Sequence, residues 1–177
     1  HPGLSLRVSV TDRCPLRCSY CRPGAGALGA ARDRILTYEQ IANFVSVVMD
    51  RYAVRQVRIT GGEPLARPQV ERLVAMLAAL GVPDLALTTN GQHLAGKAAI
   101  LRRSGLMRIN ISLDSLDPVR FREITGGGVL EKTLAGIQAA RDAGLHPIKL
   151  NTVVLRGRND REVVDLVRFA EEQGAEL

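Results

Sequence analysis

Three cysteines near the start of the sequence are the residues whose type and spacing most clearly indicate chemistry. Cys14, Cys18 and Cys21 form a C-x3-C-x2-C motif, and the sequence has no other cysteine. A loop with this spacing can bring three thiolates to one centre, and thiolates are the preferred ligands of iron–sulfur clusters. Because such a cluster usually takes four cysteines, three would leave one iron open to another ligand, as a reactive metal site requires.

Other uses of these cysteines fit the spacing less well. A zinc site of the Cys3His type would need His93 or His146, and neither lies at zinc-finger spacing from the cysteines. A ferredoxin-type electron carrier would need a fourth cysteine. An odd, tightly spaced set is also a poor disulfide framework, so we expect a metal site in a reducing cytoplasm.

The elements that must position this loop alternate between strands and helices. Thr37 and Gln40 are placed as a capping box before one of the helices. Strands are expected at 4–10, 57–60, 85–89, 108–113 and 148–155. Helices are expected through Ile41, Phe44, Val45, Val48, Met49 and Tyr52, through Val70, Leu73, Val74 and Leu77, over 95–103, through Leu130, Leu134 and Ile137, and from Asn159 or Asp160 onward through Val163, Leu166, Val167 and Ala170.

This alternation predicts an α/β fold of about five βα units with a parallel sheet. Right-handed crossovers curl successive units in the same direction, but periodicity does not distinguish a doubly wound sheet from part of a barrel. In both architectures ligands bind at the carboxyl ends of the strands. The polar and glycine-rich segments at 11–21, 61–64, 90–91 and 112–115 follow the strands, so we expect them to gather at that end.

Composition narrows the class of protein. The 177 residues suffice for one domain, and 46% apolar with 24% charged residues is ordinary for a globular protein. The longest apolar run, 73–80, is too short to cross a membrane. Net charge is +6, but the basic residues are scattered and aromatic residues make up only 3%, so we do not expect nucleic-acid binding. Because the sequence opens at His1 rather than Met, we expect a fragment.

The cysteine motif, with Tyr20 directly before its last cysteine, resembles the radical S-adenosylmethionine (SAM) superfamily. The segment Gly61-Gly62-Glu63-Pro64 resembles that superfamily's motif for the SAM amino group, although a Gly-Gly turn alone usually marks only a strand end. The resemblance implies a [4Fe–4S] cluster on the three cysteines, whose open iron binds SAM. It also implies SAM contacts for Tyr20, Gly62 and Ser112, with Glu63 in support; the alternatives are a core aromatic for Tyr20 and a strand cap for Ser112.

Six ordered segments resemble the GTP 3′,8-cyclase family of molybdenum cofactor biosynthesis, namely 6–14, 58–65, 87–91, 108–117, 121–126 and 149–155. The resemblance implies that Arg7, Arg58, Thr88 and Lys149 contact GTP. A cation inside a strand is costly to bury unless an anion pairs it, and a triphosphate would supply that anion. The alternatives are a salt bridge to a carboxylate such as Asp114 for the cations, and a strand cap for Thr88.

Several expectations follow from this resemblance. Residues 1–177 would form a truncated radical SAM core, five units of a (βα)6 barrel, and a second [4Fe–4S] cluster would lie in a C-terminal segment that the sequence lacks. The enzyme would be a lyase that converts GTP to 3′,8-cyclo-7,8-dihydro-GTP, and we expect this fragment alone not to complete that reaction. Expected partners are GTP and a one-electron reductant. A homodimer is the assembly to be tested. The rival hypotheses are a peptide- or amine-modifying radical SAM enzyme and a non-catalytic iron–sulfur or zinc module.

Overall fold

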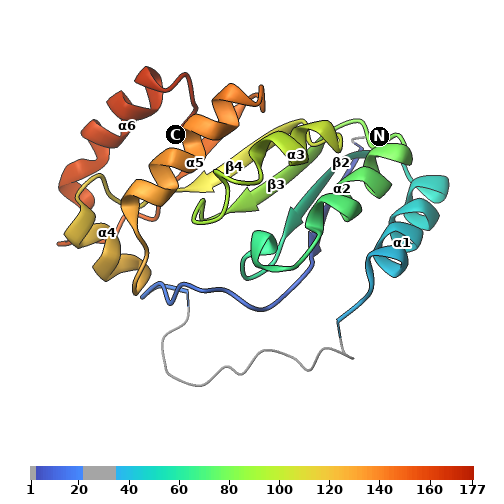
Figure 1. The fold of residues 1–177 in the computed structure, drawn as a ribbon, viewed down its shortest axis with the longest axis horizontal. Coiled ribbons are helices and arrows are strands. Elements are labelled where there is room, and N and C mark those ends of the chain that lie inside the picture. Colours follow the sequence, from blue (N-terminus) through green and yellow to red (C-terminus); the bar gives the residue numbers. More distant parts are fainter. Residues whose placement is uncertain (1–2, 22–34) are drawn as a thin grey trace.

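The computed structural model of the chain describes residues 3–21 and 35–177 (Figure 1). Five parallel strands form one sheet in sequential order, which confirms the predicted number and direction of strands. The strands are β1 (Leu4–Ser9), β2 (Val54–Thr60), β3 (Leu85–Thr89), β4 (Arg108–Ser112) and β5 (Ile148–Asn151).

Strand β5 ends four residues earlier than predicted. The Thr152 hydroxyl donates to the Leu113 carbonyl at 2.6 Å, and the Val153 N–H donates to the Asp114 carboxylate at 2.9 Å. The chain therefore leaves the ladder to bond with the loop after β4. Near the end of the chain, Glu176 pairs with Lys149 as a parallel bridge on the free edge of β5.

All the helices described lie in connections between parallel strands or after the last one. Their bounds are α1 (Tyr38–Arg51), α2 (Val70–Ala79), α3 (Ala98–Arg103), α4 (Pro118–Thr125), α5 (Leu130–Asp142) and α6 (Val163–Glu172), with short 3-10 turns η2 (Pro64–Ala66) and η3 (Asp160–Glu162). Because the strand order is sequential, right-handed crossovers place successive helices on the same face of the sheet. Helices α2, α3 and α5 cover that face, and the arrangement is part of a barrel rather than a doubly wound sheet (Figure 1).

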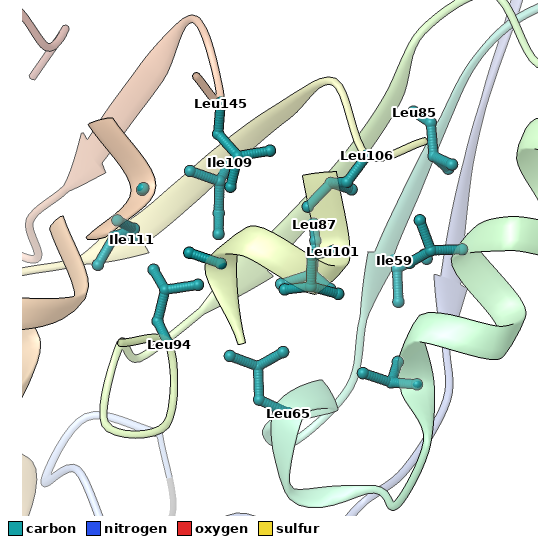
Figure 2. Close-up of a cluster of buried hydrophobic side chains, with 14 of the residues drawn as sticks. Ile59, Leu65, Leu85, Leu87, Leu94, Leu101, Leu106, Ile109, Ile111 and Leu145 are labelled. Atoms are coloured by element: carbon teal, nitrogen blue, oxygen red, sulfur yellow. The ribbon is translucent and has the colours of Figure 1, made fainter. Parts of the chain in front are cut away.

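The two faces of the sheet differ in polarity because side chains alternate along each strand. Toward the helices, Ile59, Leu87 and Ile109 are fully buried in the main apolar core (Figure 2). On the opposite face, Arg7 of β1 lies in register with Arg58 of β2. A parallel sheet covered on both faces has apolar residues on both, so this polar face indicates a barrel interior that can take a ligand.

The helix boundaries follow local signals. Thr37 accepts from the Gln40 N–H at 3.2 Å and its own N–H donates to the Gln40 side chain at 2.9 Å, so the predicted capping box is confirmed. Phe44 in α1 and Tyr52 directly after it follow the predicted apolar period, but they are 59% and 58% exposed. The reason is that α1 lies at the edge of the helical layer, next to α2 (Figure 1).

Helix α4 was not predicted, although the sequence carries its start signal. The Asp117 side chain accepts from the Arg120 N–H at 2.7 Å, and Pro118 occupies the first turn. No helix in the part of the chain that the structure describes is long and apolar enough to cross a membrane.

Candidate active site

A cavity of about 360 Å³ opens at the carboxyl ends of the strands, where the sequence predicted the functional residues to gather. Its wall combines the cysteine loop after β1 with the ends of β2, β3, β4 and β5. Of the predicted site residues it contains Arg7, Cys14, Cys18, Tyr20, Cys21, Gly62, Thr88 and Ser112. Arg58, Glu63 and Lys149 are not part of this wall.

The three cysteines share the cavity but do not converge. In the described ranges 3–21 and 35–177, no three His, Cys, Asp or Glu side chains lie close enough together to hold a metal ion. Burial raises the pKa of Cys18 to about 11, although a hydrogen bond with Tyr20 opposes the shift. A neutral thiol has little to gain from approaching its neighbours, whereas a bound metal deprotonates its thiol ligands and draws them together.

The donor set fits an iron–sulfur cluster better than zinc. The cavity presents three soft sulfur ligands, and neither His93 nor His146 lies in its wall. The Asn90 side-chain amide donates a long hydrogen bond to Cys14 Sγ at 3.7 Å. Such hydrogen bonds to sulfur tune iron–sulfur clusters, and the sequence prediction had assigned Asn90 no role.

The end of β2 holds the first half of the cysteine loop. Gly62 N–H donates to the Thr11 carbonyl at 2.6 Å, and Glu63 N–H donates to the Arg13 carbonyl at 2.8 Å. A Cβ at Gly61 or Gly62 would lie 2.4 Å from the carbonyl oxygen of Thr11 or Arg13, respectively. The cysteine loop therefore lies directly against the Cα atoms of both glycines, which also line the cavity.

The end of α4 holds the second half of the loop. Arg17 N–H donates to the Thr125 carbonyl and Ser19 N–H donates to the Ile124 carbonyl, each at 2.9 Å. The residue after the helix is Gly126, whose φ of +65° closes the helix. The cysteine loop is thus clamped between the end of β2 and a helix that the sequence prediction had missed.

Glu63 supports the site from behind the cavity wall. The residue is 1% exposed, and its carboxylate accepts hydrogen bonds from Leu65 N–H at 2.9 Å, Thr89 hydroxyl at 2.7 Å and Asn90 N–H at 2.7 Å. Burial raises the pKa of Glu63, and these hydrogen bonds oppose the rise. The side chain therefore joins the end of β2 to the end of β3.

Tyr20 and Asp114 form a second polar link across the cavity wall. The Tyr20 hydroxyl donates to Asp114 Oδ2 at 2.7 Å, although 94 residues separate the two in sequence. Burial raises the pKa of both groups, and the neighbouring Asp114 raises that of Tyr20 further. The sequence prediction considered Asp114 only as a salt-bridge partner for the cations.

The predicted cations are less buried than expected. Arg7 is exposed, and Arg58 and Lys149 are half-buried. Lys149 Nζ pairs with Glu176 at 2.6 Å rather than with Asp114. Arg58 Nε is buried and has no hydrogen-bond partner among the described residues.

Next to these cations, Asn110 is a further residue that sequence reasoning missed. It is 3% exposed, it lies in register with Thr88 and Lys149, and its Oδ1 is without a hydrogen-bond partner in the described structure. Its only sequence signal was a polar residue in the middle of an apolar strand. Buried unpaired polar atoms are rare, and they mark places where water or a ligand completes a site.

The family model of the Radical SAM superfamily matches residues 8–170. A GTP 3′,8-cyclase from Listeria monocytogenes is 46% identical over 169 residues, which cover 95% of this chain and 50% of the relative. A GTP 3′,8-cyclase from Acidothermus cellulolyticus is 48% identical over 179 residues, which cover 98% of this chain and 49% of the relative. The chain thus spans about half the length of the curated relatives it matches.

Solved structures agree with the fold. The crystal structure of Streptococcus suis SuiB bound to S-adenosylmethionine matches with a TM-score of 0.81 at 20% identity, over 98% of this chain and 39% of that one. The structure of anSMEcpe with bound AdoMet matches with a TM-score of 0.73 at 19% identity, over 97% of this chain and 49% of that one. At such identities the likeness concerns the fold alone.

Proposed function

Because the chain belongs to the radical SAM superfamily, we propose that Cys14, Cys18 and Cys21 hold a [4Fe–4S] cluster and that SAM binds beside it. The observation that carries this proposal is the shared cavity, whose wall contains the three cysteines and Gly62. Tyr20 and Ser112 line the same cavity and would contact SAM, while Glu63 fixes the strand ends behind it. When bound, the cluster and SAM would supply the radical chemistry that protein side chains lack.

The proposed substrate is GTP, and the proposed product is 3′,8-cyclo-7,8-dihydro-GTP. Relatives that carry the GTP 3′,8-cyclase name support this choice, since they are 46% and 48% identical over nearly the whole chain. The open face of the sheet adds physical support, because Arg58 Nε is unpaired and Arg7 forms no ion pair within the described residues. An arginine pair in register suits phosphate oxygens.

Each substrate residue would have a distinct task. Arg7 and Arg58 would neutralise phosphate charge and fix the pose of the nucleotide. Lys149 would have to exchange its ion pair with Glu176 for a phosphate, and that exchange is inexpensive because both side chains are partly exposed. Thr88 lies in the cavity wall together with Arg7 and the three cysteines, and its hydroxyl would bind the nucleotide.

The remaining parts of the proposal concern the longer protein. Residues 1–177 would be the radical SAM core of a chain about twice this length, since they cover about half of each relative. The second [4Fe–4S] cluster would lie in that further chain, and a one-electron reductant would serve the first cluster. The protein would work in the reducing cytoplasm, where thiolate ligands stay reduced. A homodimer is the assembly to test first.

GTP binding tests the substrate assignment. In the anaerobically reconstituted protein, Arg58→Ala should weaken GTP affinity about tenfold or more, because a charged hydrogen bond to phosphate is lost. Arg55→Ala is the matched control, since Arg55 is an exposed arginine of the same strand whose side chain lies on the opposite face of the sheet from Arg58. Unchanged GTP affinity in Arg58→Ala would favour a peptide- or amine-modifying enzyme instead.

A further inference from the structure

Asp114 is the buried carboxylate in the cavity wall that the proposed reaction leaves without a task. It is 1% exposed, and both of its carboxylate oxygens are engaged. Oδ2 accepts from the Tyr20 hydroxyl at 2.7 Å, and Oδ1 accepts from the Val153 N–H at 2.9 Å. Burying a carboxylate costs free energy, so a buried carboxylate that two donors hold in a cavity wall indicates a role in the site.

The position of Asp114 is itself fixed from the far side. The Asn159 side chain, which is fully buried, donates to the Asp114 carbonyl at 2.6 Å and to the Val153 carbonyl at 2.9 Å. Asn159 Oδ1 accepts from the Leu155 N–H at 2.7 Å. These bonds join the end of β4 to the segment after β5, so Asp114 is a rigid anchor rather than a mobile surface group.

The Tyr20 end of the cysteine loop depends on this anchor. Glu63 N–H bonds the loop at Arg13, and α4 bonds it at Arg17 and Ser19. Beyond Ser19, the backbone bond from Cys21 N–H to the Cys18 carbonyl stays within the loop. Within residues 3–21 and 35–177, the Tyr20–Asp114 hydrogen bond joins this last segment to the loop after β4.

We propose that Asp114 is a positioning residue, which acts through the Tyr20 hydroxyl to hold the ring of Tyr20 and the Cys21 end of the loop in place for the cluster and SAM. The inference rests on the proposed function, because it assumes that the cavity takes both groups. Asp114 fixes the hydroxyl of Tyr20, so the tyrosine offers its ring face to the ligand. A bound cofactor then meets a loop end that is already ordered, which lowers the entropy lost on binding.

The test compares Tyr20→Phe, Asp114→Ala and the double variant after anaerobic reconstitution. SAM affinity and the change that SAM makes in the electron paramagnetic resonance spectrum of the reduced cluster are measured, together with iron per chain. Each single variant should bind SAM about tenfold more weakly, as expected for the loss of one hydrogen bond that orders a binding group. The double variant should bind no more weakly than the worse single variant, because both changes remove the same link.

Asp84→Ala is the matched control, since it removes an aspartate that bonds to Arg108 and Gln56 near the amino ends of the strands. It should leave SAM affinity and the spectrum unchanged. Should Asp114→Ala fail to fold, Tyr20→Phe still decides the matter, because Tyr20 is 38% exposed and its ring is retained.

Unchanged SAM affinity and spectrum in Tyr20→Phe would overturn the inference, and so would additive losses in the double variant. An equal loss in Asp84→Ala would also overturn it, because the effect would then be one of general stability. If the wild-type protein takes up no iron or binds no SAM, the proposed function itself fails. Normal wild-type binding with unaffected variants refutes only the role of Asp114.

Discussion

Crowded backbone and buried carboxylates distinguish the carboxyl end of the sheet from the amino end. At the carboxyl end, Glu63 and Asp114 are each 1% exposed, and Gly62 lies against the backbone of the cysteine loop. Near the amino end, Asp84 bonds to Arg108, with side-chain exposures of 33% and 15%, and the turn at Gly81 has open space around it.

The difference shows that the energetically costly features of the fold are concentrated at the end of the sheet that carries the candidate site. At the amino end, the strands are connected by ordinary turns and a partly exposed ion pair. Such a pair contributes little to stability. Buried charges and close backbone contacts cost free energy and survive where the surrounding structure determines them. Substitutions should therefore be much more costly at the carboxyl end, and the four predictions below test that contrast from the largest expected effect to the smallest.

The largest effect is expected for Gly62→Ala compared with Gly81→Ala. A Cβ at Gly62 would lie 2.4 Å from the Arg13 carbonyl oxygen and 2.7 Å from the Asp12 carbonyl oxygen, and these backbone atoms cannot move aside cheaply. We expect a loss of about 3 kcal/mol in the free energy of unfolding, measured by denaturant titration, together with loss of iron binding. Gly81 has a φ of +76° but nothing within 4 Å, so Gly81→Ala should cost only about 1 kcal/mol. Equal costs at the two positions would contradict the account.

Glu63→Gln should have the next largest effect. The carboxylate accepts hydrogen bonds from Leu65 N–H, Thr89 hydroxyl and Asn90 N–H, and a glutamine would turn a donor toward one of them. A loss of about 2 kcal/mol is expected from the unpaired buried groups. Thermal and urea unfolding of the two proteins measure it, and a glutamine variant as stable as the wild type would show that these bonds contribute nothing.

The raised pKa of Glu63 also predicts that the stability of the protein depends on pH. Burial raises its pKa above the ordinary value of 4.5, so the folded protein holds this proton more tightly than the unfolded chain does. The contribution of Glu63 to stability is therefore complete below pH 4.5 and is lost as the pH rises through the raised pKa. The stability difference between wild type and Glu63→Gln should shift in favour of the variant with rising pH in that window. A difference independent of pH would mean that the pKa of Glu63 is the same in both states.

The smallest effect is expected for Asp84→Ala at the amino end. Asp84 accepts from Arg108 Nε at 2.6 Å and from Gln56 Nε2 at 2.6 Å, but the group is one-third exposed. Solvent screens such a pair, so the loss should be about 1 kcal/mol or less, with iron content unaffected. A loss larger than that of Glu63→Gln would reverse the proposed contrast between the two ends.

The sequence predicted the order of elements well because its signals are local. Alternating strand and helix patterns gave five parallel strands, and the Thr37–Gln40 box located the start of α1. The predicted end of β5 was wrong because Val153 continues an apolar run, yet its N–H bonds to Asp114 in the loop after β4. Helix α4 was missed although Asp117 and Pro118 mark its start.

The site was predicted in part for the same reason. Motifs at strand ends placed the cysteines and Gly62 in one cavity, because parallel strands bring their carboxyl ends together. The link between Tyr20 and Asp114 was beyond reach, since a pairing over 94 residues depends on tertiary contacts. The exposure of Arg7 could not be predicted either, because it depends on what covers the inner face of the sheet rather than on the strand itself.

The central claim is that the cysteine loop holds an iron–sulfur cluster next to a SAM site. Anaerobic reconstitution with iron and sulfide, followed by reduction in the presence of SAM, tests it most directly. We expect about four iron atoms per chain, cleavage of SAM to methionine and 5′-deoxyadenosine, and loss of both when Cys18 is replaced by alanine. Zinc in place of iron, or a full iron complement that leaves SAM intact, would contradict the account.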